Sequence, residues 1–230
     1  MTYTASQIVQ EACAIAKVPG YLAQGGRNLN LTLHDLVMHR NLKVNLVPTT
    51  ITFAAATNGP FNLETDYART YDLFYYVDST PYFLEPASLR EYDQEPVPLG
   101  INNYPYEFAT DLSGVPTVGY GLLYIYPQFS TQTTCTHRYF KLRPEITSPE
   151  TSSAIPWFED QDYLIHATAT RLMRITDDDR YLAWQQEGEV LLRKHLLMEG
   201  DEQQVVKEVK LDPRRFKVSG GNRPTKSDPF

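Results

Sequence analysis

The chain has 230 residues, of which 42% are hydrophobic and 21% charged, as is usual for a globular protein of one large or two small domains. Its formal net charge of −7 argues against a dedicated nucleic-acid binder, which needs Lys and Arg side chains to displace phosphate counterions. Residues 1–200 hold 23 acidic and 14 basic side chains, whereas residues 201–230 hold 5 and 7. We therefore expect an acidic body and a mildly basic tail with different roles.

Cysteine usage and the N-terminal sequence bear on the compartment. Cys13 and Cys135 are far apart and form no CxxC spacing, so we expect free thiols in a reducing compartment. The N-terminus has neither the basic nor the apolar region of a signal peptide, and no apolar run reaches the ~18–20 residues of a membrane span. These features predict a soluble protein made in a cytoplasm.

Residues 1–43 are predicted to form a pair of helices. Apolar residues recur at helical spacing in "TASQIVQEACAIAKV", which opens with a capping-box pattern, and "PGY" ends this helix. In the second helix, expected over 21–41, four leucines share one side and Leu31 and Met38 lie roughly opposite. A second apolar side indicates packing on two sides of the helix.

Residues 44–150 show the alternation that is typical of strands, interrupted by turn signals. We expect an antiparallel β lobe with one short helix at 87–95 and an exposed loop at 96–105. The expected strands are 50–53, 60–63, 70–77, 81–85, 105–110, 118–127 and 133–142.

Residues 151–200 are predicted to return to helix, at 160–175 and 181–198. The acidic run between them fits a solvated helix start. In the last helix, Leu192 and Leu196 face nearly opposite to Val190 and Leu197, so this helix is also two-sided.

Residues 201–230 contain few apolar side chains with which to build a core. Ordering a residue costs about 1–2 kcal/mol of backbone entropy, so we expect this tail to become ordered only along another chain. The whole pattern predicts an α+β fold. Its terminal helices form a helical bundle, its central region is an antiparallel β lobe, and its C-terminal tail is extended.

The sequence offers no recognisable catalytic or metal-binding constellation. His34 and His39 are five residues apart and lie on different helix faces, and the other three histidines fall in separate elements, so we expect lone surface histidines. The acidic run 177–179 lacks the alternating ligands and the glycine of a calcium loop. Carboxylate pairs such as Glu64 and Asp66 are common in loops. We expect no enzyme and no cofactor.

Sixteen tyrosines are the compositional anomaly. Many fall at alternate positions of the expected strands, as half-buried sheet residues or subunit contacts would. A sugar-stacking platform is the alternative interpretation. The tyrosines concerned are Tyr71, Tyr75, Tyr104, Tyr106, Tyr120, Tyr124 and Tyr126.

Three stretches carry a family resemblance: "ASQIVQEACAIAKVPGY", "IPWFEDQDYLIHATATRLMRITDDDRYLAWQQEGEVLLRKHL" and "KEVKLDPRRF". Together with the order of the elements, they resemble head-to-tail adaptor proteins of short-tailed bacteriophages, most specifically over residues 4–21 and 155–216. The central strands match in character only, and the β lobe is larger than in the shorter adaptors.

The resemblance implies a non-enzymatic virion protein at the head-tail junction, made in the bacterial host cytoplasm. Such adaptors form a ring, usually of twelve copies, beneath the portal of a DNA-filled capsid. Their helices surround the DNA channel, which passes genomic DNA without sequence-specific binding. Their C-terminal segment docks on the portal ring, and the opposite side receives the tail nozzle and in some cases a tail fibre.

This interpretation assigns residues to two kinds of contact. A ring needs two different adhesive faces on each protomer, and the two-sided helices supply candidates. The predicted subunit-interface residues are Leu31, Met38, Leu192 and Leu196. The tail supplies a strand-forming segment followed by charged and aromatic anchors for the portal. These predicted portal-binding residues are Val206, Val209, Leu211, Arg214, Arg215 and Phe216.

A rival hypothesis is a carbohydrate- or receptor-binding β module of a phage tail fibre or baseplate. The helical ends and the long tail favour the adaptor, since a receptor-binding tip would be expected to consist of strands alone.

Overall fold

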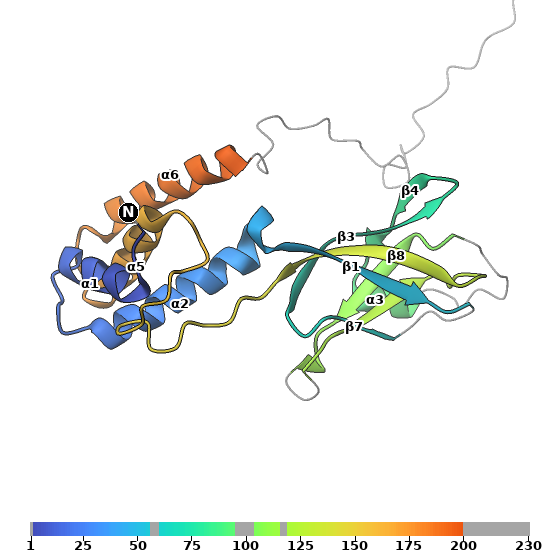
Figure 1. Cartoon of the computed structure of the whole chain (residues 1–230), viewed down its shortest axis with the longest axis horizontal. Helices are drawn as coiled ribbons and strands as arrows, with labels where there is room; N and C mark the ends of the chain where they lie inside the picture. The colour runs from blue at the N-terminus through green and yellow to red at the C-terminus, as the bar shows by residue number, and fades with distance from the viewer. Residues whose placement is uncertain (1, 56–59, 95–103, 116–118, 200–230) are drawn as a thin grey trace, which may run out of the picture.

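The protein has two lobes arranged end to end, one of helices and one of strands (Figure 1). This computed structural model describes residues 2–55, 60–94, 104–115 and 119–199. The mixed α+β class expected from the sequence is confirmed. The predicted tail, residues 201–230, lies outside the described residues.

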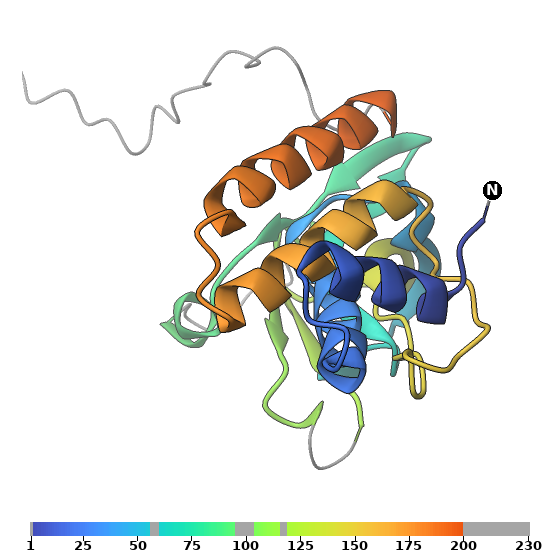
Figure 2. The same cartoon turned by 90° about the vertical axis from the view of Figure 1, so that its left-hand side faces the viewer.

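The helical lobe brings the two ends of the described chain together (Figures 1 and 2). Its helices are α1 (Ala5–Ile15), α2 (Leu22–His39), α5 (Gln161–Ile175) and α6 (Tyr181–Glu199). Figure 2 shows α5 between α6 and the α1–α2 pair, and α5 contacts all three. The buried side chains at the centre include Ile8, Val9, Leu29, Leu33, Leu36, Leu164, Leu172, Met173, Leu192 and Leu196.

Local sequence signals explain where these helices begin and how closely they pack. The Thr4 backbone N–H donates to Gln7 Oε1 at 2.9 Å and Gln7 N–H donates to Thr4 Oγ1 at 3.4 Å, which confirms the predicted capping box. Asp160 caps α5 by accepting from Tyr163 N–H at 3.0 Å. α1 and α2 approach closely at Gly25, where an added Cβ would lie 3.0 Å from Val9 Cγ1.

The β lobe consists of two four-stranded sheets. The first has the order β1 (Leu46–Phe53), β8 (Thr133–Lys141), β3 (Tyr67–Val77) and β4 (Thr80–Phe83). The second has the order β2 (Phe61–Asn62), β7 (Leu122–Tyr126), β6 (Glu107–Asp111) and β5 (Glu85–Pro86). The short helices are η1 (Lys43–Asn45) and α3 (Leu89–Gln94).

The core of this lobe contains side chains of both sheets, among them Phe53, Leu73, Tyr75, Cys135, Phe108, Leu123 and Ile125. The prediction of an entirely antiparallel lobe needs one correction, because β5 pairs with β6 in parallel. Cys13 and Cys135 are free, as expected, and both are buried.

The hairpin between β3 and β4 turns through two residues with left-handed backbone, Asp78 (φ 47°) and Ser79 (φ 67°). Two positive φ angles in a two-residue loop are typical of a type I′ turn, which favours glycine at its second position. A left-handed backbone costs an L-residue roughly 1–2 kcal/mol, and glycine avoids this cost. Glycine also has more conformational entropy in the unfolded chain, which offsets part of the gain. We therefore expect Ser79→Gly to raise the free energy of unfolding by about 1 kcal/mol.

Chemical denaturation of the two proteins measures this difference. Ser153→Gly, at an exposed serine outside any hairpin turn, is the matched control and should be neutral or slightly destabilising. A lower stability for Ser79→Gly would show that the turn does not carry this strain.

Candidate interaction surfaces

α6 carries apolar side chains on two opposite sides. Leu192 and Leu196 are 1% and 3% exposed and belong to the helical core. On the other side, Val190 and Leu197 lie seven residues apart and are 52% and 38% exposed. We call these two residues the α6 stripe. An exposed apolar stripe on a helix whose other side is already packed is typical of a protein–protein contact.

This arrangement overturns part of the predicted subunit interface. Leu192 and Leu196 were expected to meet a neighbouring copy, but both are enclosed by the protomer's own core. Helical periodicity separates the two apolar sides without telling which one faces α5. Leu31 is 49% exposed and Met38 is half-buried, so these two remain predictions for an interface.

A polar groove runs beside the α6 stripe, between α2 and α6 and over α5. It is lined by Asp35 and Arg40 from the α2 side, Tyr163 and Arg171 from α5, and Glu189 from α6. Arg40 Nη2 lies 3.1 Å from Glu189 Oε2, and Arg171 pairs with Asp35. These ion pairs are partly exposed, and such pairs contribute only about 0–1 kcal/mol to folding. Charged side chains of a partner can therefore replace these ion pairs with little loss of folding stability.

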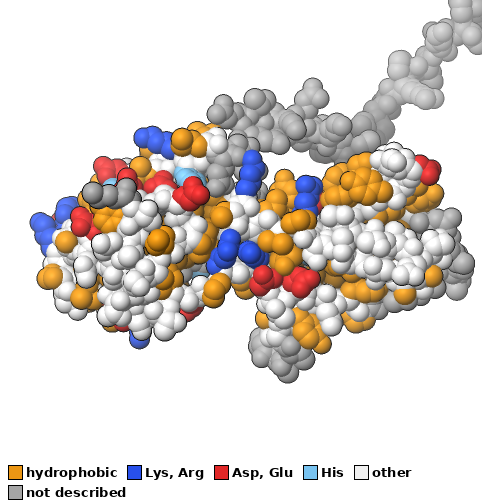
Figure 3. All heavy atoms as spheres, viewed as in Figure 1, with side chains coloured by type: hydrophobic (Ala, Val, Ile, Leu, Met, Phe, Trp, Pro, Cys, Tyr) orange, Lys and Arg blue, Asp and Glu red, His pale blue; other side chains and the backbone are white. Residues whose placement is uncertain are grey.

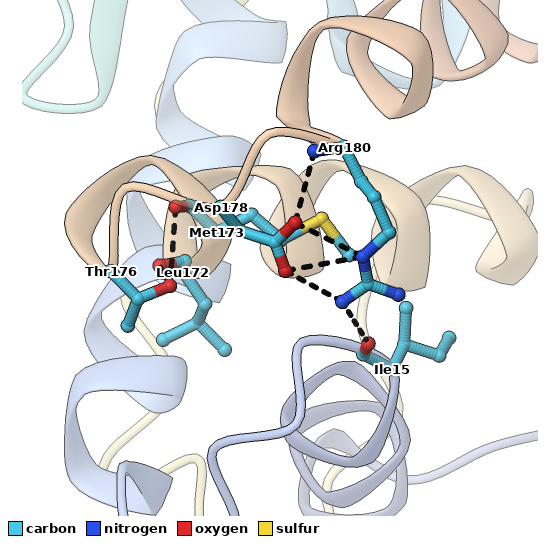
Figure 4. A network of polar contacts seen from close by, with 6 residues as sticks. All are labelled: Ile15, Leu172, Met173, Thr176, Asp178 and Arg180. Atoms are coloured by element: carbon cyan, nitrogen blue, oxygen red, sulfur yellow. Dashed lines mark hydrogen bonds and ion pairs between the residues drawn. The ribbon is translucent and has the colours of Figure 1, made fainter.

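The turn between α5 and α6 fixes the direction in which α6 leaves the core (Figure 4). Asp178 Oδ1 accepts from the Arg180 backbone N–H at 2.9 Å, and the Arg180 guanidinium donates to the same carboxylate. Arg180 Nη2 also donates to Ile15 O at the end of α1, at 3.3 Å. The hydrogen bonds from the Arg180 side chain and backbone lower the pKa of Asp178 to about 2. The Arg180 side chain thus ties the turn to α1, and the Asp178 carboxylate, which stays ionised at neutral pH, holds that side chain in place.

A second apolar surface lies on the first sheet of the β lobe. Tyr71, Tyr76 and Phe83 are 45%, 60% and 55% exposed, and Phe74 lies between them with its ring 5.6 Å from Tyr76 and 5.1 Å from Phe83. We call these four residues the aromatic patch. Edge-to-face and tilted ring pairs at these distances are favourable.

One arginine holds the aromatic patch in place. The Arg138 guanidinium lies 5.3 Å from the Phe74 ring centre and 5.4 Å from that of Tyr71, and it pairs with Asp72. Cation–π contacts of this kind contribute about 0.5–1 kcal/mol at exposed sites. The patch is therefore a preorganised aromatic surface with the Arg138–Asp72 ion pair beside it.

The tyrosines singled out from the sequence have mixed surroundings. Tyr120 and Tyr124 are half-buried, as many were expected to be, whereas Tyr75 and Tyr126 are buried and Tyr71, Tyr104 and Tyr106 are exposed. Tyr75, Tyr82 and Tyr104 form a ring stack, with centres 5.9 and 6.2 Å apart. The sequence reasoning missed Tyr76 and Tyr82, although the pairing of Tyr82 with Tyr75 across the hairpin turn follows from the spacing of the two strands.

Histidines were expected on the surface, but His137 is 1% exposed. Its Nε2 lies 3.0 Å from Thr70 Oγ1. Within the described residues, no group of three or more His, Cys, Asp or Glu side chains is placed to hold a metal ion. His137 is therefore a buried residue of the β lobe with a hydrogen-bond partner inside the first sheet.

Burial lowers the pKa of His137 to about 4, against a partly opposing effect of the Asp72 charge. An unfolded histidine takes up a proton near pH 6.5, whereas the buried ring resists it until about pH 4. The free energy of unfolding should therefore fall by roughly 3 kcal/mol between these two pH values and level off below them.

Urea denaturation of the wild type and of His137→Gln, from pH 7 to pH 4, measures this effect. The free energy of unfolding should change less with pH in His137→Gln than in the wild type. His39→Gln, at an exposed histidine, is the control. Equal slopes for the wild type and His137→Gln would contradict the assignment.

Neither a protein-family model nor a curated protein matches the sequence. In the described part of the chain, no helix has the length and apolar character required to span a membrane. The six predicted portal-binding residues lie outside the described residues and stay predictions.

Proposed function

We propose that the protein is a non-enzymatic virion component, a ring-forming head-to-tail adaptor of a short-tailed bacteriophage. It docks beneath the portal, extends the DNA channel and attaches tail components. The observation that carries this proposal is the presence of two unlike exposed apolar surfaces on one elongated protomer. The α6 stripe belongs to the helical lobe and the aromatic patch to the β lobe (Figures 1 and 3).

A ring of identical copies is built from heterologous contacts, in which one face of a protomer meets a different face of the next. The α6 stripe supplies one adhesive face, and the groove that adjoins it contains weak ion pairs that a neighbour can replace. Leu31 and Met38 of α2 are the candidates for the other face. In this proposal the α6 face of one protomer meets the α2 face of the next copy, and the helices act as the bundle around the channel.

The charge distribution supports the same function. Residues 1–200 carry a net acidic charge, and a channel wall of this kind lets the DNA duplex slide, whereas a strongly basic lining would bind its phosphates tightly. The mildly basic tail provides Arg214, Arg215 and Phe216 as anchors on the portal, preceded by Val206, Val209 and Leu211. The β lobe then offers its aromatic patch to the tail nozzle or fibre.

Complementation of adaptor-deficient heads tests the proposal. DNA-filled heads from a phage whose copy of this gene carries an early stop codon should lack tails and leak DNA. Adding the purified protein should restore tail attachment and infectivity. Heads that carry complete tails without the protein would contradict the proposed function.

The second candidate function, carbohydrate or receptor binding by the β lobe, is favoured by the exposed rings of Tyr76, Tyr82 and Tyr104. Exposed aromatic rings stack on apolar faces of ligands. A glycan array probed with the full chain distinguishes the two. Saturable binding that is lost in Tyr82→Ala would favour the receptor-binding module over the adaptor.

A further inference from the structure

The two lobes meet at the C-terminal end of α2. The chain leaves the helical lobe through residues 40–46 and returns after β8, and α2 contacts β3 at this junction (Figure 1). Lys and Arg side chains gather here on the face that Figure 3 shows. The contacts of Arg69 and Arg143 explain how the lobes are joined.

Arg69 of β3 reaches across the junction to the end of α2. Its Nε donates to Val37 O at 3.3 Å and its Nη2 to Arg40 O at 2.5 Å. Its Nη1 donates to Asn41 Oδ1 at 2.9 Å. The guanidinium also lies 4.0 Å from the ring centre of Phe140 on β8. One side chain of the β lobe therefore holds three acceptors of the helical lobe while it stacks on its own sheet.

The backbone of β3 explains why Arg69 points out of the sheet toward α2. The register of β3 against β8 shifts between Tyr67 and Arg69, which marks a β-bulge or similar irregularity. Bulges redirect side chains and are common where a strand serves a specific contact. In this position the guanidinium meets Val37 O, which the last turn of α2 leaves without an intrahelical partner at the negative end of the helix dipole, and Arg40 O, which follows the helix.

A second arginine braces the connecting chain itself. Arg143, which follows β8, donates from Nε to Asn45 Oδ1 at 3.0 Å and from Nη2 to Val44 O at 2.7 Å. Asn45 is fully buried. The two chain segments that cross between the lobes are thus fastened to each other, next to the Arg69 contacts.

We infer that Arg69 is a positioning residue that fixes the angle between the lobes, so that the protomer is one rigid bracket rather than two tethered domains. This inference deepens the proposed adaptor function, and the role that we give to the rigid junction rests on that function. With the lobes fixed, the aromatic patch of every copy takes one constant position relative to the helical lobe that forms the ring. Burial lowers the pKa of Arg69, which agrees with a guanidinium partly withdrawn from water, and a lysine could not make its forked contacts.

Distance measurements between the lobes test the bracket on the isolated full-length protein. Spin labels are attached to cysteines at Gln186 on α6 and Thr50 on β1, both exposed, while the native Cys13 and Cys135 are buried. We expect a single narrow distance distribution in the otherwise wild-type protein. Arg69→Gln and Arg69→Lys should each widen it at least about two-fold.

Arg138→Gln is the matched control, because Arg138 also pairs with a carboxylate and lies near aromatic rings, but within the β lobe alone. Its distribution should keep the wild-type width. A broad distribution in the wild type would overturn the inference whether or not the variants fold. An unchanged distribution in folded Arg69→Lys would overturn it as well. Attachment of the wild type to portal-bearing heads is a separate measurement, so failure of the bracket and failure of the adaptor function are distinguishable.

Discussion

Replacing Leu196 by Asp is expected to unfold the helical lobe, whereas the same change at the next residue, Leu197, should leave the fold intact and abolish ring assembly. Leu196 is 3% exposed in the helical core and Leu197 is 38% exposed in the α6 stripe. A carboxylate without a partner in a core costs about 3–5 kcal/mol, which is a large part of a domain's total stability. A surface substitution usually changes stability by less than about 0.5 kcal/mol.

Circular dichroism during thermal unfolding measures the first effect, and sedimentation with adaptor-deficient heads measures the second. Because the two residues are adjacent on one helix, helix propensity and the added charge are matched between the variants. The account of the α6 stripe fails if folded Leu197→Asp attaches to heads as the wild type does.

Truncation after Gly200 is expected to leave a folded body that no longer joins portal-bearing heads. The named core side chains of both lobes precede residue 200, so the melting temperature should stay close to that of the full chain. A modest contact made by each tail gives a high combined affinity when it is repeated around a ring. Loss of the tails should therefore weaken attachment to the heads by at least about 100-fold.

Truncation after Phe216 is the matched control for the shorter protein. It removes the last 14 residues but keeps all six predicted portal-binding residues. Attachment should therefore persist. Equal attachment of the protein truncated after Gly200 would show that the docking contacts lie in the body.

Helix limits could be predicted closely because their signals are local. The expected helices at 160–175 and 181–198 agree with Gln161–Ile175 and Tyr181–Glu199. Capping side chains and apolar periodicity act within a few residues of each terminus. The inward side of α6 depends instead on where α5 lies, which is a property of the tertiary structure.

The strands were less predictable because pairing partners are distant in sequence. The expected strand 81–85 divides into β4 and β5, which belong to different sheets. Leu84 between them is buried, 4% exposed, in the core of the β lobe. An alternating pattern indicates an extended chain but not the point at which it crosses from one sheet to another.

The burial of His137 and the junction formed by Arg69 could not be predicted from the sequence, because both depend on contacts with residues that are distant along the chain. A polar side chain at an alternating position reads as solvent-facing, yet the Thr70 hydroxyl on β3 gives His137 a partner inside the sheet. The acceptors of Arg69 lie about 30 residues away, at the end of α2. Contacts across such separations have no signature in a single sequence.

The mass of the complex between the protein and its isolated portal ring tests the central claim most directly. Mass photometry should show a discrete species heavier than the portal by about twelve copies of the 26.3 kDa chain, without intermediates at saturation. The protein truncated after Gly200 should add no mass. A portal whose mass is unchanged by the full-length protein would contradict the account.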